Sequence, residues 1–73
     1  MNPEYGAEVI DHNGQILGTV DHLIRNLNTG EIRKFMVRRK SPEKDLFLSP
    51  EDILEATDDT VKMGVTLEEI NQQ

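Results

Sequence analysis

The sequence contains no cysteine and no tryptophan, and it has only one tyrosine and two phenylalanines among 73 residues. Without cysteine, the chain cannot form disulfide bonds, thiolate zinc sites or a cysteine nucleophile. No apolar run approaches the roughly 18 residues that a membrane helix needs, and the opening Met-Asn-Pro-Glu lacks the basic and apolar parts of a signal peptide. We therefore expect a soluble, cytoplasmic protein with no membrane insertion, held together by apolar packing.

The short length limits the chain to one small domain. A chain of this size buries only about 60% of its unfolded surface, which leaves no room for a second core. We accordingly predict a single domain over residues 1–73. The net charge of −6 disfavours a general coat for nucleic acid or for an anionic membrane.

Turn-forming residues interrupt the chain at 13–14, 26–30, 41–45, 49–50 and 58–59, so only strand-length segments fit between them. Asn-Gly at 13–14 is the strongest local hairpin signal and predicts a type I′ turn between strands at 7–10 and 15–25. We predict further strands at 31–39, 46–48 and 60–63. The fold class is therefore all-β, with about five to six strands.

The long second strand carries apolar residues of both parities. Ile16 and Val20 share one face, whereas Leu23 falls on the other, which predicts a bulge near Asp21 or His22. Gly18 offers a place for the strand to bend sharply. Both phenylalanines are expected inside. The remaining predicted core consists of Val9, Ile16, Val20, Val37, Leu46, Leu48, Ile53, Val61 and Met63.

Two short helical pieces are expected after the fourth strand. Ser49 is a cap residue followed by proline and two acids, which predicts one helical turn that delivers Ile53 and Leu54 to the core. Thr66 and Glu69 repeat the capping pattern, so a short C-terminal helix is expected over 66–70.

The order of these landmarks resembles the PRC-barrel family. The opening hairpin of that family is similar to residues 6–11, 13–14 and 16–21, and its second turn to 29–32. Its apolar third strand, the short turn before its last strands and its closing strand are similar to 35–37, 48–53 and 58–63. The resemblance covers about residues 6–63 and implies a small, strongly bent β-barrel there, with a C-terminal tail at 64–73.

The resemblance also implies a function. The family includes the ribosome maturation factor, the cytoplasmic part of the photosynthetic reaction centre H subunit, archaeal division-associated proteins and many stand-alone proteins. Its fold serves as a protein-binding module, and it has no shared catalytic residues to transfer. With neither a preceding domain nor a membrane helix, this chain looks like the stand-alone type.

The polar residues suggest no reaction chemistry. If the chain reverses at 13–14, His12 and His22 lie roughly seven residues, or about 23 Å, apart along the hairpin, so one metal ion cannot bridge them within a chain. A metal site shared between subunits is the alternative. The acids between 51 and 59 fit neither a calcium loop nor an acid/base pair and suggest a solvated face. We expect no enzyme activity, and no catalytic, cofactor-binding or metal-binding residues.

Charge is unevenly distributed along the chain. Residues 25–47 carry seven bases and three acids, whereas 48–73 carry seven acids and one lysine. We predict that the basic third strand and its loop contact an acidic protein partner through Arg33, Arg38, Arg39 and Lys40. The alternative is a solvated strand end whose charges keep the edge from pairing with other chains.

Two further functional hypotheses follow. An RNA-linked role in ribosome maturation or rRNA processing is the runner-up, disfavoured because only Tyr5 is expected to be free for base stacking. A small-molecule sensor is weaker, since so short a barrel leaves little interior.

The complementary charges also predict a homodimer. The apolar tail residues Leu67 and Ile70 are its expected contacts, because they have no clear place in the barrel.

Overall fold

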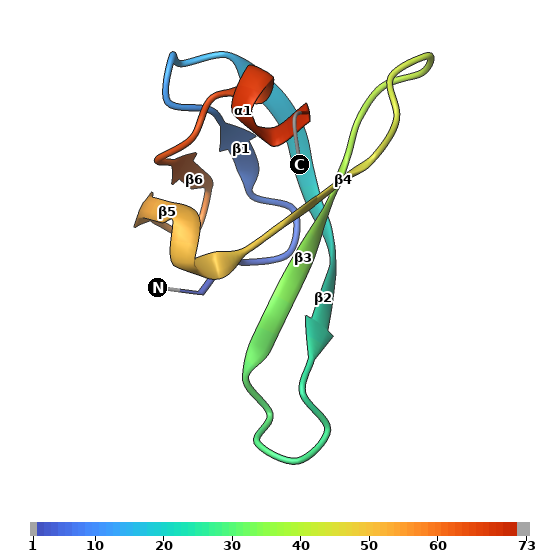
Figure 1. Ribbon diagram of the computed structural model, residues 1–73, viewed down its shortest axis with the longest axis vertical. Coiled ribbons are helices and arrows are strands. Elements are labelled where there is room, and N and C mark those ends of the chain that lie inside the picture. Colours follow the sequence, from blue (N-terminus) through green and yellow to red (C-terminus); the bar gives the residue numbers. More distant parts are fainter. Residues whose placement is uncertain (1, 72–73) are drawn as a thin grey trace.

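The computed structural model describes residues 2–71 and contains six strands and two short helical segments (Figure 1). In chain order these are β1 (Glu8–Ile10), β2 (Ile16–Arg25), β3 (Ile32–Arg38), β4 (Leu46–Leu48), the 3₁₀ turn η1 (Pro50–Asp52), β5 (Ile53–Ala56), β6 (Thr60–Met63) and α1 (Leu67–Asn71). The predicted all-β class and the predicted short C-terminal helix are both confirmed.

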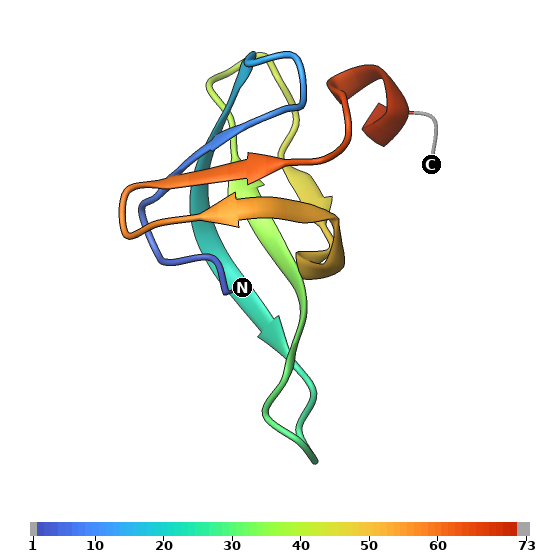
Figure 2. The ribbon, with the colours of Figure 1, turned by 90° about the vertical axis from the view of Figure 1, so that its left-hand side faces the viewer.

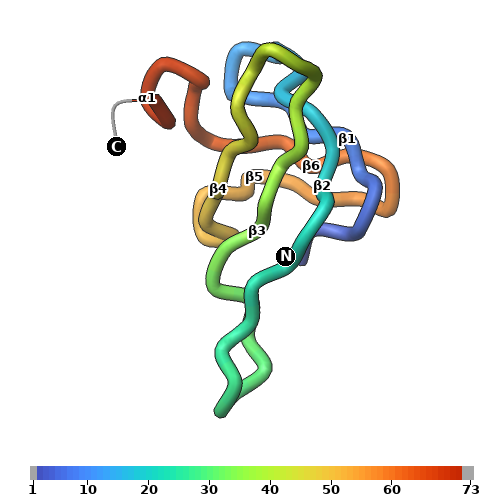
Figure 3. Tube along the Cα trace, turned by 90° about the vertical axis from the view of Figure 1, so that its right-hand side faces the viewer, coloured from blue at the N-terminus to red at the C-terminus, as the bar shows by residue number. Residues whose placement is uncertain are grey.

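The six strands form one curled sheet in the order β4-β3-β2-β1-β6-β5. All neighbouring pairs are antiparallel except β1 and β6, which run parallel. The curl places β5 and β6 on one side of the molecule, facing the viewer in Figure 2, and β2, β3 and β4 on the other side, facing the viewer in Figure 3. The far ends of β2 and β3 extend beyond the barrel as a hairpin along the 33 Å long axis.

The core fills the inside of this curl. Phe35, Val37, Val9, Val61 and Met63 are fully buried. Around them lie the other buried apolar side chains: Ala7, Leu17, Val20, Leu48 and Ile53. Each strand therefore supplies at least one buried side chain to a single apolar cluster.

The turn between β1 and β2 differs from the predicted type I′ turn. The amide of Gly14 donates to the carbonyl oxygen of Asp11, and the amide of Asp11 donates to that of Gln15, so three residues span the reversal instead of two. Only Gly14 has a positive φ there, at 84°, which is the pattern of a type I turn followed by a glycine bulge. The predicted hairpin is confirmed, but a two-residue turn at 13–14, which would pair His12 with Gln15, is wrong because Asp11 pairs with Gln15.

A bulge then restores the predicted register. Ile10 pairs with Ile16 and Val9 pairs with Gly18, which leaves Leu17 as the extra residue. This bulge turns Leu17 into the core at 3% exposure and leaves Ile16 59% exposed. The prediction that Ile16 belongs to the core is therefore wrong.

Gly18 lies where β2 passes very close to β3. A Cβ atom at this position would lie 2.1 Å from the carbonyl oxygen of Arg38, and the φ of Gly18 is 153°. Only glycine fits, and the reason is this close approach of the β3 backbone, whereas the sequence predicted a bend. Further along β2, the register shifts between Val20 and His22, where the sequence predicted a bulge.

Two other predicted core residues lie at the surface. Phe47, in the middle of β4, is 57% exposed because Leu46 and Leu48 on either side point inward. Leu54 is 54% exposed because the chain passes from η1 directly into β5, where alternate side chains face opposite ways, and only Ile53 is buried. The predicted helical turn is present, but Ser49 forms no side-chain cap; its hydroxyl accepts a hydrogen bond from Lys34 Nζ at 2.8 Å.

The C-terminal helix α1 begins with the predicted capping box. The amide of Thr66 donates to Glu69 Oε1 at 3.0 Å, and the amide of Glu69 donates to Thr66 Oγ1 at 3.2 Å. Leu67 and Ile70 are half-buried and pack against the core. The premise that they have no place in the barrel is therefore wrong, and they retain less free apolar surface for self-association than the sequence suggested.

The side chain of Asp11 joins α1 to the turn between β1 and β2. Its Oδ1 accepts the amides of Asn13 and Gln15 at 2.9 and 2.8 Å, and its Oδ2 accepts the amide of Leu67 at 3.0 Å. Asp11 is only 1% exposed. It is thus a buried carboxylate that connects residues 56 positions apart.

Candidate functional site

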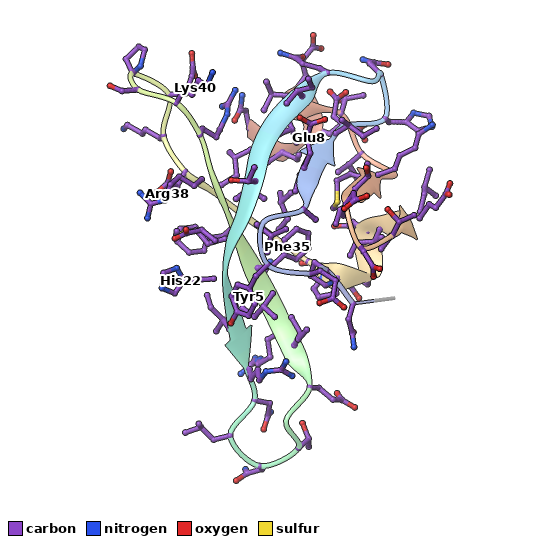
Figure 4. The ribbon with its side chains drawn as sticks, turned by 180° about the vertical axis from the view of Figure 1, so that it is seen from behind. Tyr5, Glu8, His22, Phe35, Arg38 and Lys40 are labelled. Carbon is purple, nitrogen blue, oxygen red and sulfur yellow. The ribbon has the colours of Figure 1, made fainter. Side chains whose placement is uncertain are left out.

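The convex side of β2, β3 and β4 carries an ordered set of exposed side chains, which we call the outer face. It is arranged in three rows across the strands. Between β2 and β3, Thr19 pairs with Arg38, His22 with Met36, and Ile24 with Lys34. The middle row continues onto β4, where Met36 also pairs with Phe47. Figure 4 shows Arg38 and His22 pointing away from the barrel, whereas Phe35, from the same β3, points into it.

The middle row makes the centre of the outer face apolar. Phe47 is 57% exposed, Met36 is half-buried, and Ile24 in the next row is exposed. Arg38 and Lys34 lie on β3 two residues to either side of Met36, so the apolar centre has one cation at each end. Because successive residues of a strand rise by about 3.3 Å, the Cα atoms of Lys34 and Arg38 are roughly 13 Å apart.

Asp21 organises the Arg38 end of this face. Its Oδ2 accepts a hydrogen bond from Arg38 Nη2 at 2.9 Å and lies 2.8 Å from His22 Nδ1. The hydrogen bond from Arg38, followed by that with His22, lowers the pKa of the Asp21 carboxyl, and Asp21 in turn raises the pKa of Arg38. Arg38 is therefore oriented by a neighbour while 59% of its side chain stays exposed.

A groove of about 710 Å³ adjoins the outer face where β2 passes β3. Glu8, Ile16, Gly18 and Thr19 lie along one part of it, and Arg38, Arg39 and Lys40 along another. The exposed Ile16 gives the groove an apolar wall. Its charges are mixed, because Glu8 faces the same space as the cations.

The structure separates the four cations predicted to contact a partner. Arg38 and Lys40 are exposed and line the groove. Arg39 is different: its side chain is 12% exposed, its Nε donates to the carbonyl oxygen of Leu17 at 3.1 Å, and its Nη1 lies 3.5 Å from Glu43 Oε2. Arg39 thus holds the bulge of β2. Arg33 is exposed but lies outside the groove lining.

The sequence does not identify the apolar members of the outer face, Met36 and Phe47, as surface residues. It predicts Phe47 in the core and Met36 only as part of an apolar strand. The alternation of Lys34, Met36 and Arg38 with the buried Phe35 and Val37 is the signal that could have found them, because side chains two apart share one face of a strand.

Neither histidine belongs to a metal cluster within residues 2–71, where no group of three or more histidines, aspartates and glutamates is placed to hold an ion. His22 contacts Asp21, and His12 lies exposed in the turn between β1 and β2.

The architecture and the groove can now be compared with known families. The model of the PRC-barrel domain matches residues 5–69, which is nearly the whole chain. The chain belongs to the PRC-barrel family. Comparison with curated proteins finds no match.

Membership agrees with the expected family and slightly extends the expected limits of 6–63, because the match includes Thr66 and Glu69, the residues of the capping box. In the part of this PRC-barrel that the structure describes, no helix is long and apolar enough to cross a membrane.

Proposed function

We propose that this PRC-barrel is a non-enzymatic protein-binding and assembly module that holds an acidic segment of a partner on its outer face and also self-associates, with a homodimer as the first product. The observation that supports this is the apolar pair of the half-buried Met36 and the exposed Phe47 between Arg38 and Lys34. Exposed apolar clusters rimmed by polar residues are typical of interaction sites, and aromatic and methionine side chains are enriched at interface centres.

The spacing of this face defines the partner's chemistry. An extended segment with acids at positions one and five and an apolar residue at position three would present all three side chains on one side. Its acids would then lie opposite Arg38 and Lys34, and its apolar residue would cover Met36 and Phe47. The contact would be sensitive to salt because the cations are exposed.

A titration followed by two-dimensional NMR tests the proposal. The probe is a blocked peptide containing Glu-Thr-Leu-Thr-Glu, and the matched control contains Lys-Thr-Leu-Thr-Lys. We expect saturable shifts of the β2, β3 and β4 amides with the acidic peptide only. Shifts that are absent, or that map to β5 and β6, would contradict the proposal.

Substitution of Phe47 sharpens this test. About half of the Phe47 side chain is exposed, so a bound partner can bury about half of its apolar surface. Phe47→Ser removes this surface, and we expect it to weaken binding of the acidic peptide about fivefold to tenfold. Leu27→Ser is the matched control, since Leu27 is fully exposed at the tip of the β2–β3 hairpin and lies outside the outer face. Equal effects of the two substitutions would show that Phe47 is not a contact.

The exposure of Phe47 also bears on the second candidate, an RNA-linked role in ribosome maturation or rRNA processing. Base stacking was disfavoured because Phe47 was expected in the core, but its ring is exposed on the face that carries Arg38 and Lys34. The same titration with a mixed-sequence single-stranded RNA tests this role. Shifts centred on Phe47 that weaken steeply with salt would favour RNA over the acidic peptide.

A further inference from the structure

A second surface of the molecule has the opposite character to the outer face. We call it the acidic face, and it comprises Glu51, Asp52, Leu54 and Glu55 together with Asp58 and Asp59 in the turn between β5 and β6. Leu54 is 54% exposed, and it leans over Gly64, where an added Cβ would lie 3.2 Å from Leu54 Cγ. An exposed apolar residue therefore stands among acids, as Phe47 stands among cations.

The two faces are complementary in charge and in apolar content. Lys34 and Arg38 flank Met36 and Phe47 on the outer face, and Leu54 has Asp52 of η1 before it and Glu55 of β5 after it. Resting on the protein-binding function proposed above, we infer that self-association docks the acidic face of a second copy, centred on Leu54, on the outer face. The run from Asp52 to Ala56 has an acid at position one and the apolar Leu54 at position three, and its second acid is Glu55 at position four. Leu54 of one copy then covers Phe47 and Met36 of the other.

The position of the two faces fixes the kind of assembly. Figures 2 and 3 show β5 and β2–β4 on opposite sides of the barrel. A contact between unlike faces is heterologous, so a two-copy assembly keeps one unused outer face and one unused acidic face. The dimer is thus the first member of a head-to-tail series that grows with concentration, unlike a two-fold dimer, which stops at two copies.

Sedimentation velocity over a range of concentrations tests the inference with two charge-reversed variants. Lys34→Glu/Arg38→Glu reverses the outer face, and Glu51→Lys/Glu55→Lys reverses the acidic face. We expect the wild-type mass to rise continuously with concentration, and each variant alone to associate at least tenfold more weakly. An equimolar mixture should associate again, because the first variant keeps the native acidic face and the second keeps the native outer face.

Two further variants guard against misinterpretation. Lys44→Glu makes a charge change of the same sign in the loop between β3 and β4 and should leave association intact, since Lys44 belongs to neither face. Lys34→Glu/Phe47→Ser disrupts the outer face without removing Arg38 from its contact with Asp21, in case the first variant fails to fold. Circular dichroism confirms folding of each variant.

Several outcomes would overturn the inference: a wild-type protein that stays monomeric, a mass that stops at two copies, variants that associate like wild type, or a mixture that stays monomeric. The peptide titration separates these failures from failure of the proposed function. Peptide shifts on the outer face without self-association would refute only the role of a second copy, whereas the absence of both would refute the proposed function as well.

Discussion

The buried carboxylate of Asp11 offers the sharpest test of how this fold is held together. Its three acceptor contacts link the turn between β1 and β2 to the first residue of α1. Asp11→Asn keeps the size of the side chain but replaces one oxygen by an NH₂ group. If the remaining oxygen stays with Asn13 and Gln15, the NH₂ group faces the amide of Leu67, and two donors then oppose each other.

The expected loss follows from these contacts. A hydrogen bond to a charged group contributes about 1.5–3 kcal/mol, and the bond from Leu67 is removed outright. The bonds from Asn13 and Gln15 become bonds to a neutral acceptor and weaken. We therefore expect Asp11→Asn to lower the free energy of unfolding by about 2–3 kcal/mol, which at about 4–8 °C per kcal/mol for a domain of this size lowers Tm by roughly 10–20 °C.

The effect has a defined dependence on pH. Burial acts to raise the pKa of Asp11, but the backbone N–H groups of Leu67, Gln15 and Asn13 outweigh it and hold the pKa below its ordinary value. A carboxyl whose pKa is lower in the folded state stabilises the fold above its unfolded pKa of about 3.9 and loses that contribution as pH falls through the folded pKa. The difference between wild type and Asp11→Asn should therefore be constant near neutrality and shrink below about pH 4.

Denaturant unfolding followed by far-ultraviolet circular dichroism measures this difference at neutral and acid pH. The exposed Asp58→Asn serves as the matched control and should change stability by less than about 0.5 kcal/mol. A loss below 1 kcal/mol for Asp11→Asn, or one that is the same at pH 7 and at about pH 3, would refute the reasoning.

Two more predictions concern the local structure. Gly18→Ala places a Cβ atom against the carbonyl oxygen of Arg38 and should cost about 3 kcal/mol or more, or prevent folding, as thermal unfolding would show. A Cβ atom in Gly14→Ala meets no atom within 4 Å, so this substitution should lower the free energy of unfolding by only about 1 kcal/mol, because of the positive φ. Equal losses of stability at Gly14 and Gly18 would contradict the close approach of β3 to Gly18. Glu69→Ala removes the acceptor of the Thr66 amide and should cost about 0.5–1 kcal/mol, measurable as faster amide exchange in α1; unchanged exchange would contradict the cap.

Five of the six strands could be predicted along the chain because their signals are local, whereas β5 was not expected. Glycine and asparagine marked the reversals, and the bulge near His22 showed itself as a change of parity between Val20 and Leu23. That Gly18 is a special position was also readable, since a glycine inside a strand often marks a bulge, a bend or the close approach of another backbone; the structure shows the last of these.

The direction of individual side chains could not be predicted in segments where neighbouring residues are all apolar. Ile16 and Leu17 are both apolar, so nothing local says which one a bulge turns inward. β4 consists of three apolar residues, and only its pairing with β3 shows that Phe47 faces outward. The central residues of the candidate site were hidden by this ambiguity.

Asp11 was invisible for another reason. Its contact with Leu67 exists only once the barrel brings the C-terminal segment beside the first turn, so no spacing in the sequence announces it. Arg39 is a similar case: the sequence groups it with its cationic neighbours, but folding directs its Nε to the carbonyl oxygen of Leu17.

The alternation of side chains over residues 34–38 of β3 has a further consequence. Phe35 and Val37 are fully buried, whereas Lys34 and Arg38 are exposed and Met36 is half-buried. Replacing the second set leaves the first untouched, so what this strand recognises can be changed over evolutionary time without altering what it stabilises. The five residues from Lys34 to Arg38 thereby separate adaptability from folding.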